Sequence, residues 1–146
     1  MTLENLQQIG RLKPHATDRA EIRRLLEAAR RNLADAGVKT ISLETRFDAA
    51  YKAIMQGALA ALMANGYRPD TKAPGHHATL VQTLPKTIGL PSQHVVVLDA
   101  LRKKRNLSDY SGMWVDEVST DSCIAEAGRL LQMVESWLAD NRPDLI

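Results

Sequence analysis

The sequence predicts an all-α protein, and three observations support that fold class. Alanine and leucine are abundant, whereas aromatic residues make up only 4% of the 146 residues. Apolar residues recur at intervals of three and four positions, which is the period of one face of an α-helix. Alternating β-branched residues, which are typical of strands, are scarce. A hydrophobic content of 45% over this length supplies a single core, so we expect one domain.

The first 16 residues lack this period, and we expect residues 1–16 to form a mobile N-terminal segment. The first long helix should begin at Thr17 or Asp18, since either side chain can cap it. Its apolar stripe continues until Gly37, a residue type that commonly follows the end of a helix. The folded domain is therefore predicted to begin at residue 17.

A second long helix is predicted after Ser42, which can cap it, and ends at Asn65-Gly66. Small residues are spread along this segment: Ala49, Ala50, Ala53, Gly57, Ala58, Ala60 and Ala61. Small side chains let another helix approach closely. We therefore expect this helix to be the central element of the fold.

The middle of the chain is divided by prolines and glycines. Tyr67–Gly75 contains two prolines and is predicted to be a connecting loop. His76–Ile88 should form a shorter helix that Pro85 breaks or kinks. Ser92 can cap a further long helix, which continues to about Ser108.

The last long helix should start at Ser119 or Thr120 and stop at Asn141, which leaves residues 142–146 as a C-terminal tail. Four long helices with one short extra helix and short connections are typical of an up-and-down antiparallel four-helix bundle. We expect this bundle to span residues 17–141.

The composition favours a cytoplasmic protein. Cys123 is the only cysteine, so no internal disulfide can form, which fits a reducing compartment. No uncharged apolar run is long enough to span a bilayer, and Met1–Pro14 lacks the basic-then-apolar order of a signal peptide. We expect no membrane partner. The histidines and the cysteine lack ligand spacing, so we expect no metal and no cofactor, with Cys123 in the core. His77 is expected in a packing or capping role, and its proton chemistry near neutral pH also keeps it as a candidate functional residue.

Charge is divided unevenly along the chain. The formal net charge of +2 is too small to indicate non-specific nucleic-acid binding. Residues 106–146 hold two basic and eight acidic side chains, a net charge of −6, whereas residues 1–105 carry +8. The border is the densest basic run, Arg102-Lys103-Lys104-Arg105. This run can serve an anionic ligand or complement the dipole at the end of its helix, and both interpretations stay open.

Arg105 is the main candidate for a functional residue. On a helix it falls between the directions of Leu98 and Leu101, which places it on the apolar stripe. A guanidinium there requires a partner, and its forked donors suit carboxylate or phosphate oxygens. Three interpretations stay open: an internal ion pair with Asp48 or Glu44, a side chain that extends to the bundle edge, or a phosphate ligand in a shared cleft.

Polar residues that follow Arg105 complete the candidate site. Asn106 offers donors and an acceptor, and Tyr110 could direct its hydroxyl back toward Arg105. The candidate catalytic residues are Arg105, Asn106 and Tyr110. The candidate phosphate or nucleotide ligands are Arg105, Arg102, Asp48 and Asp109.

The order of these residues resembles the HEPN superfamily, in particular small stand-alone members whose fourth helix ends in an Arg…Asp-Tyr sequence. The similarity covers about residues 20–140 and includes Arg46-Phe47-Asp48-Ala49-Ala50-Tyr51 and the segment Leu101–Tyr110. It implies a four- to five-helix bundle that forms a homodimer, in which two copies of the helix-four motif face each other across a cleft.

HEPN members with the full motif, an Arg followed by a His, are metal-independent endoribonucleases, and many are toxins paired with a small nucleotidyltransferase. There the Arg stabilises the anionic phosphorane and the His assists proton transfer. Arg105 matches the Arg and Asn106 the polar residue after it, whereas Tyr110 occupies the place of the His. The resemblance therefore implies binding of RNA or a nucleotide at a dimer cleft, with a nucleotidyltransferase as an expected partner protein.

Tyr110 leaves enzymatic activity open, because an unperturbed tyrosine pKa of about 10 makes it a poor base at pH 7. In related toxin pairs a tyrosine near the motif is nucleotidylated, so Tyr110 is also a candidate modification site. The alternative function is a catalytically silent interaction module or a substrate of a partner nucleotidyltransferase. A plain bundle with Arg105 in an internal salt bridge is the third interpretation.

Overall fold

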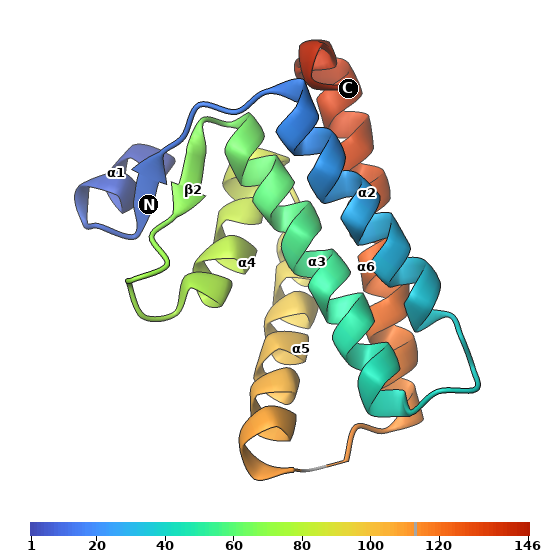
Figure 1. The fold of residues 1–146 in the computed structure, drawn as a ribbon. Helices are drawn as coiled ribbons and strands as arrows, with labels where there is room; N and C mark the ends of the chain where they lie inside the picture. The colour runs from blue at the N-terminus through green and yellow to red at the C-terminus, as the bar shows by residue number, and fades with distance from the viewer. Residues whose placement is uncertain (113) are drawn as a thin grey trace.

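The computed structural model describes residues 1–112 and 114–146. Most of these residues are helical, which confirms the predicted all-α class apart from one small two-stranded sheet. The elements follow in the order α1 (Leu3–Gln8), β1 (Leu12–Pro14), α2 (Arg19–Ala36), α3 (Leu43–Ala64), β2 (Tyr67–Pro69), α4 (His76–Thr87), α5 (Ser92–Ser111), α6 (Glu117–Asn141) and a final 3-10 turn, η1 (Pro143–Leu145) (Figure 1).

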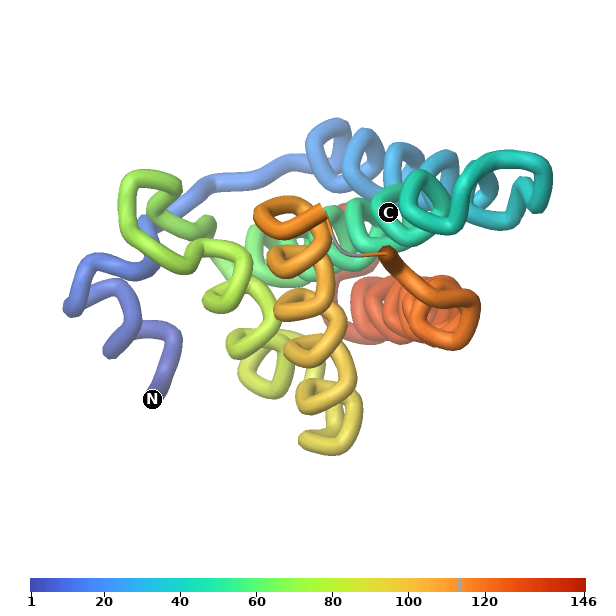
Figure 2. Tube along the Cα trace, turned by 90° about the horizontal axis from the view of Figure 1, so that it is seen from below, coloured from blue at the N-terminus to red at the C-terminus, as the bar shows by residue number. Residues whose placement is uncertain are grey.

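Helix α3 is the centre of the fold. It packs against α2 and α6 on one side and against α4 and α5 on the other (Figure 1 and Figure 2). In Figure 1, α2 and α5 descend whereas α3 and α6 ascend, and Figure 2 shows that α5 lies across α2 and α3. No helix in the described part of the chain combines the length and the apolar content needed to cross a membrane.

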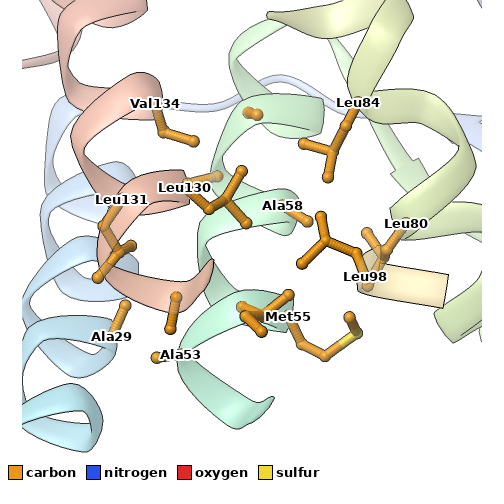
Figure 3. Close-up of a cluster of buried hydrophobic side chains, with 14 of the residues drawn as sticks. Ala29, Ala53, Met55, Ala58, Leu80, Leu84, Leu98, Leu130, Leu131 and Val134 are labelled. Atoms are coloured by element: carbon orange, nitrogen blue, oxygen red, sulfur yellow. The ribbon is translucent and has the colours of Figure 1, made fainter. Parts of the chain in front are cut away.

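Small side chains on α3 bring the neighbouring helices close, as the sequence predicts. A Cβ atom placed on Gly57 would lie 3.0 Å from Cδ2 of Leu131 on α6. Figure 3 shows the two parts of the core around α3: Ala29, Leu130, Leu131 and Val134 lie on one side, and Leu80, Leu84 and Leu98 lie on the other. The core is therefore continuous through α3 and joins all five of the longer helices.

The caps predicted for α2 and α3 are confirmed, whereas those predicted for α5 and α6 are wrong. Asp18 caps α2 and Ser42 caps α3, each accepting a hydrogen bond from a backbone N–H in the first turn. Helix α6 starts earlier than Ser119 or Thr120, because Asp116 accepts the N–H of Ser119 and caps the helix there. Ser92 does not cap α5: the preceding proline takes the extended cap conformation, and Ser92 is already helical.

The terminal segments are built into the fold. In residues 1–16, for which we expected mobility, α1 is followed by β1, and β1 pairs antiparallel with β2 inside the expected loop Tyr67–Gly75. Leu6 and Leu12 are buried. In the tail 142–146, Arg142 donates to the carbonyl of Ala64 at the end of α3, at 2.7 Å, and Leu145 is buried. A three-residue strand and a single turn are too short to produce a periodic signal in the sequence.

Pro85 lies within the last turn of α4 and does not break the helix. The loss of its N–H as a donor removes one hydrogen bond near the helix end, where fraying is least costly. Helix α4 therefore reaches Thr87, and its first residues, His76 and His77, lie beside α3 and β2.

Candidate functional site

Arg105 lies on the side of α5 that faces α3. Its guanidinium carbon, Cζ, is 5.1 Å from the ring centroid of Tyr51, which is a cation–π distance. Five side chains gather here and are called the Arg105 cluster: Asp48 and Tyr51 from α3, His77 from α4, and Arg105 and Asp109 from α5. The cluster thus joins three helices, each contributing a titratable group.

The ion pair of Arg105 differs from both carboxylates that we proposed for it. Within residues 1–112 and 114–146, its salt-bridge partner is Asp109 of the same helix, with 3.4 Å between Nε and Oδ2, and neither Asp48 nor Glu44 comes within ion-pair distance. The buried Nε has no hydrogen-bond partner among the described residues, and Asp109 is exposed. Arg105 is therefore held mainly by the ring of Tyr51 and weakly by a surface carboxylate.

Tyr51 and His77 form the second contact of the cluster. The Tyr51 hydroxyl lies 3.2 Å from Nδ1 of His77, within hydrogen-bond distance. The His76 ring meets His77 edge to face, with 4.6 Å between centroids. Tyr51 belongs to a segment that carries the family resemblance, but the sequence assigns it no role in the site, and for His77 the sequence favours packing or capping over proton chemistry. The structure brings both beside Arg105.

The surroundings shift the pKa values of three cluster members. Partial burial and the nearby Asp109 carboxylate raise the pKa of Asp48, against the opposing effect of Arg105. Burial raises the pKa of Tyr51 to about 12, so its hydroxyl stays protonated. Burial, followed by the nearby His76, Arg105 and Arg102, lowers the pKa of His77. At neutral pH the cluster therefore holds a neutral imidazole beside a cation.

Tyr110 does not join Arg105. Five positions along a helix correspond to about 140° of rotation, and the Tyr110 side chain points outward with 90% of its surface exposed. Asn106 is half-buried and makes no side-chain hydrogen bond among the described residues. Arg102 is engaged by Asp99, with 2.9 Å between Nη2 and Oδ1. Of the six proposed site residues, Arg105, Asp109 and Asp48 therefore lie together, and Tyr110 lies apart.

The structure also describes the surroundings of the Cys123 thiol and of the side chains that could bind a metal. Cys123 is fully buried, and burial raises the pKa of its thiol to about 12, so it is a core residue as expected. In the described part of the chain, no three His, Cys, Asp or Glu side chains come together as a metal site would need.

A stripe of exposed apolar residues covers the outer side of α5 and continues onto the start of α6. Its members, here called the α5 stripe, are Val96, Leu107, Tyr110, Trp114 and Val118. Trp114 is 82% exposed and Val118 is 76% exposed. Because Val96 and Arg105 are nine positions apart, they lie about 180° from each other around the helix. The stripe and the Arg105 cluster therefore occupy opposite sides of α5.

Neither a protein-family model nor a curated protein matches the chain.

We predict that His77 makes folding stability depend on pH between about 7.5 and 5.5. Its pKa is lowered in the folded state, so the unfolded chain binds more protons as the pH falls through the ordinary histidine value, and the free energy of unfolding should decrease. Urea titrations of the wild type and His77→Gln at both pH values measure the difference. Comparing the two proteins cancels the contributions of His15 and His94, which pair with Glu21 and Glu126. An equal decrease in both proteins would contradict this assignment.

Proposed function

We propose that this chain is a HEPN-like helical protein that binds RNA or a nucleotide through a phosphate at Arg105. One observation carries the proposal: the guanidinium is held on the ring of Tyr51, and its buried Nε has no hydrogen-bond partner among the described residues. A cation–π contact does not use the N–H donors of a guanidinium, and these donors suit phosphate oxygens. The site is thus prepared for an anion.

An internal structural role for Arg105 is less consistent with these contacts. A buried guanidinium retained for stability would be paired with a well-aligned carboxylate on another helix. Its ion pair with Asp109 joins two residues of one helix, and exposed pairs at this spacing contribute only about 0.3–0.5 kcal/mol. A phosphate can displace such a partner at little cost.

The arrangement of the helices supports the family resemblance. The four longest helices, α2, α3, α5 and α6, alternately descend and ascend in Figure 1, as in an up-and-down arrangement, while α5 lies across α2 and α3 (Figure 2). Counted from α2 with the short α4 included, α5 is the fourth helix, which is the place of the motif in HEPN members, and Arg105 lies near its C-terminal end.

Replacement of Arg105 should test phosphate binding directly. Arg105→Met should weaken binding of a fluorescein-labelled single-stranded RNA by about tenfold or more, because it removes charge-assisted hydrogen bonds to phosphate. It should also reduce the slope of log affinity against log salt by about one. Fluorescence polarisation over a salt series measures both.

Arg23→Met is the matched control, since Arg23 is an exposed arginine on α2, away from the cluster. Thermal unfolding of both variants checks that folding is preserved. If the two variants bind RNA equally well, the phosphate site is not at Arg105.

A catalytic form of the proposal assigns proton transfer to His77 instead of Tyr110. His77 uses Nδ1 toward Tyr51, which leaves Nε2 for a substrate, and its lowered pKa keeps it neutral at pH 7. Tyr110 lies around the helix from Arg105 and is poorly placed for that role. An imidazole on α4 would then supply the group that the α5 motif lacks.

We expect wild-type protein to cleave RNA in the presence of EDTA, and both Arg105→Ala and His77→Gln to abolish cleavage. Tyr110→Phe should retain it. If neutral His77 accepts the proton, the rate should rise with pH through a value below the ordinary histidine pKa and be level by about pH 7. Gel analysis of labelled RNA over a pH series measures this, and a wild type without metal-independent cleavage would exclude the catalytic form alone.

A homodimer is also proposed, with the α5 stripe as its contact. Exposed apolar side chains of this size, gathered on neighbouring elements, are typical of interaction surfaces. Because the stripe lies opposite Arg105, a dimer formed there leaves each Arg105 cluster open instead of enclosing both in one cleft. The 90% exposure of Tyr110 supports instead the second candidate function, in which a partner nucleotidyltransferase modifies this chain, and that function needs the α5 stripe to be free of a second copy.

Val118→Asp should convert the dimer to a monomer at micromolar concentration, because it places a charge in the apolar contact. An aspartate near the start of α6 is compatible with the helix itself. Sedimentation velocity measures the mass, with Val38→Asp as the control, since Val38 is an exposed valine in the loop after α2. A monomeric wild type would exclude the dimer.

A further inference from the structure

A pocket lies between α3, α4 and β2, beside the Arg105 cluster. Its volume is about 320 Å³, and His77 belongs both to its lining and to the cluster. The apolar side chains of the lining are Met55, Leu59, Met63, Pro69 and Leu80. Together they provide a hydrocarbon surface that is open on one side to solvent.

Two cations stand among the lining residues without carboxylate partners. Lys52 on α3 and Arg68 on β2 line the pocket, and neither forms an ion pair among residues 1–112 and 114–146. The pocket lining contains no aspartate or glutamate. The Arg105 cluster differs in this respect, because Asp48 and Asp109 surround its cation. The pocket is therefore lined by apolar side chains and by two cations, without a carboxylate in the lining.

We propose that this pocket binds a small organic anion with an apolar body, of the medium-chain carboxylate type. The methionine, leucine and proline side chains favour a hydrocarbon chain, since its burial removes apolar surface from water. Lys52 and Arg68 are the cations of the lining, and they provide charge complementarity for an anionic ligand. This site adjoins the proposed phosphate site at Arg105 and shares His77 with it, but its ligand makes no use of Arg105.

The polar groups of the lining favour an aliphatic ligand over a nucleobase. A buried base needs partners for its ring edge. The Gln56 side-chain oxygen already accepts a hydrogen bond from Asn32 at 2.8 Å, and Nδ1 of His77 is engaged by Tyr51. The other polar groups of the lining are Thr71, His76 and Nε2 of His77, beside five apolar side chains. This mainly hydrocarbon surface suits an aliphatic chain, which needs no polar partner.

Methionine methyl groups give a local measurement of binding to the full-length protein. Met55 and Met63 line the pocket, whereas Met133 lies on α6 and is not part of it. In protein labelled with carbon-13 at the methionine methyls, octanoate should shift the Met55 and Met63 signals in a saturable manner and leave Met133 unchanged. The absence of a saturable shift at Met55 and Met63 would overturn the proposal.

Ligands of matched size distinguish the contribution of charge to binding from the contribution of the hydrocarbon chain. We expect octanoate to bind more tightly than 1-octanol and octylamine to bind most weakly, since Lys52 and Arg68 repel an ammonium group. Equal binding of octylamine and octanoate would overturn the proposal. Binding of adenosine monophosphate at Met55 and Met63 without binding of octanoate would also overturn it, in favour of a nucleotide pocket.

Substitutions in the pocket complete the test. Lys52→Met and Arg68→Met should each weaken octanoate binding by about two- to fivefold, the range for a solvent-accessible charge pair, and leave 1-octanol binding unchanged. Lys86→Met is the control, since Lys86 is an exposed lysine near the end of α4, outside the pocket. Leu59→Trp should fill the pocket and abolish binding. Unchanged octanoate affinity in both cation variants would exclude the assigned site, whatever the RNA-binding result for Arg105→Met.

Discussion

Alanine and glycine residues of α3 set the distance between this helix and its neighbours α2 and α6. Of the 22 residues of α3, 13 are buried, and most of these are small. At Gly57 even one additional carbon would meet Leu131 at 3.0 Å. α3 also carries large buried side chains, including Phe47, Ile54 and Leu62, so small and bulky positions are combined along this one helix.

Residues of the first half of α3 enter both proposed binding sites. Asp48 and Tyr51 belong to the Arg105 cluster, and Lys52 lines the pocket. At the start of α3, the buried Arg46 donates to the carbonyl of Ala36 at 2.8 Å and so pairs an unsatisfied group at the end of α2. This hydrogen bond connects the start of α3 to the end of α2.

Helical periodicity and caps were sufficient to predict the five longer helices, because each signal is local. Ser42 and Asp18 act on backbone groups within three residues, so their roles can be derived from the sequence. The partners of Arg105 are a different case. Tyr51 and His77 reach it from two other helices, and a contact between residues this far apart leaves no spacing signal. Tyr110 shows the converse, since five positions along a regular helix turn it away from Arg105.

The short ladder between β1 and β2 connects the beginning of the chain to the pocket. Leu12 pairs with Pro69, and Pro69 is part of the pocket lining. The backbone of Arg11 also accepts the N–H of Asp70 at 3.0 Å. The first 14 residues thus hold β2, which forms one wall of the pocket, in place. Proteolysis before Leu12, or a fusion partner that pulls β1 away, would open that wall while the five longer helices kept their packing.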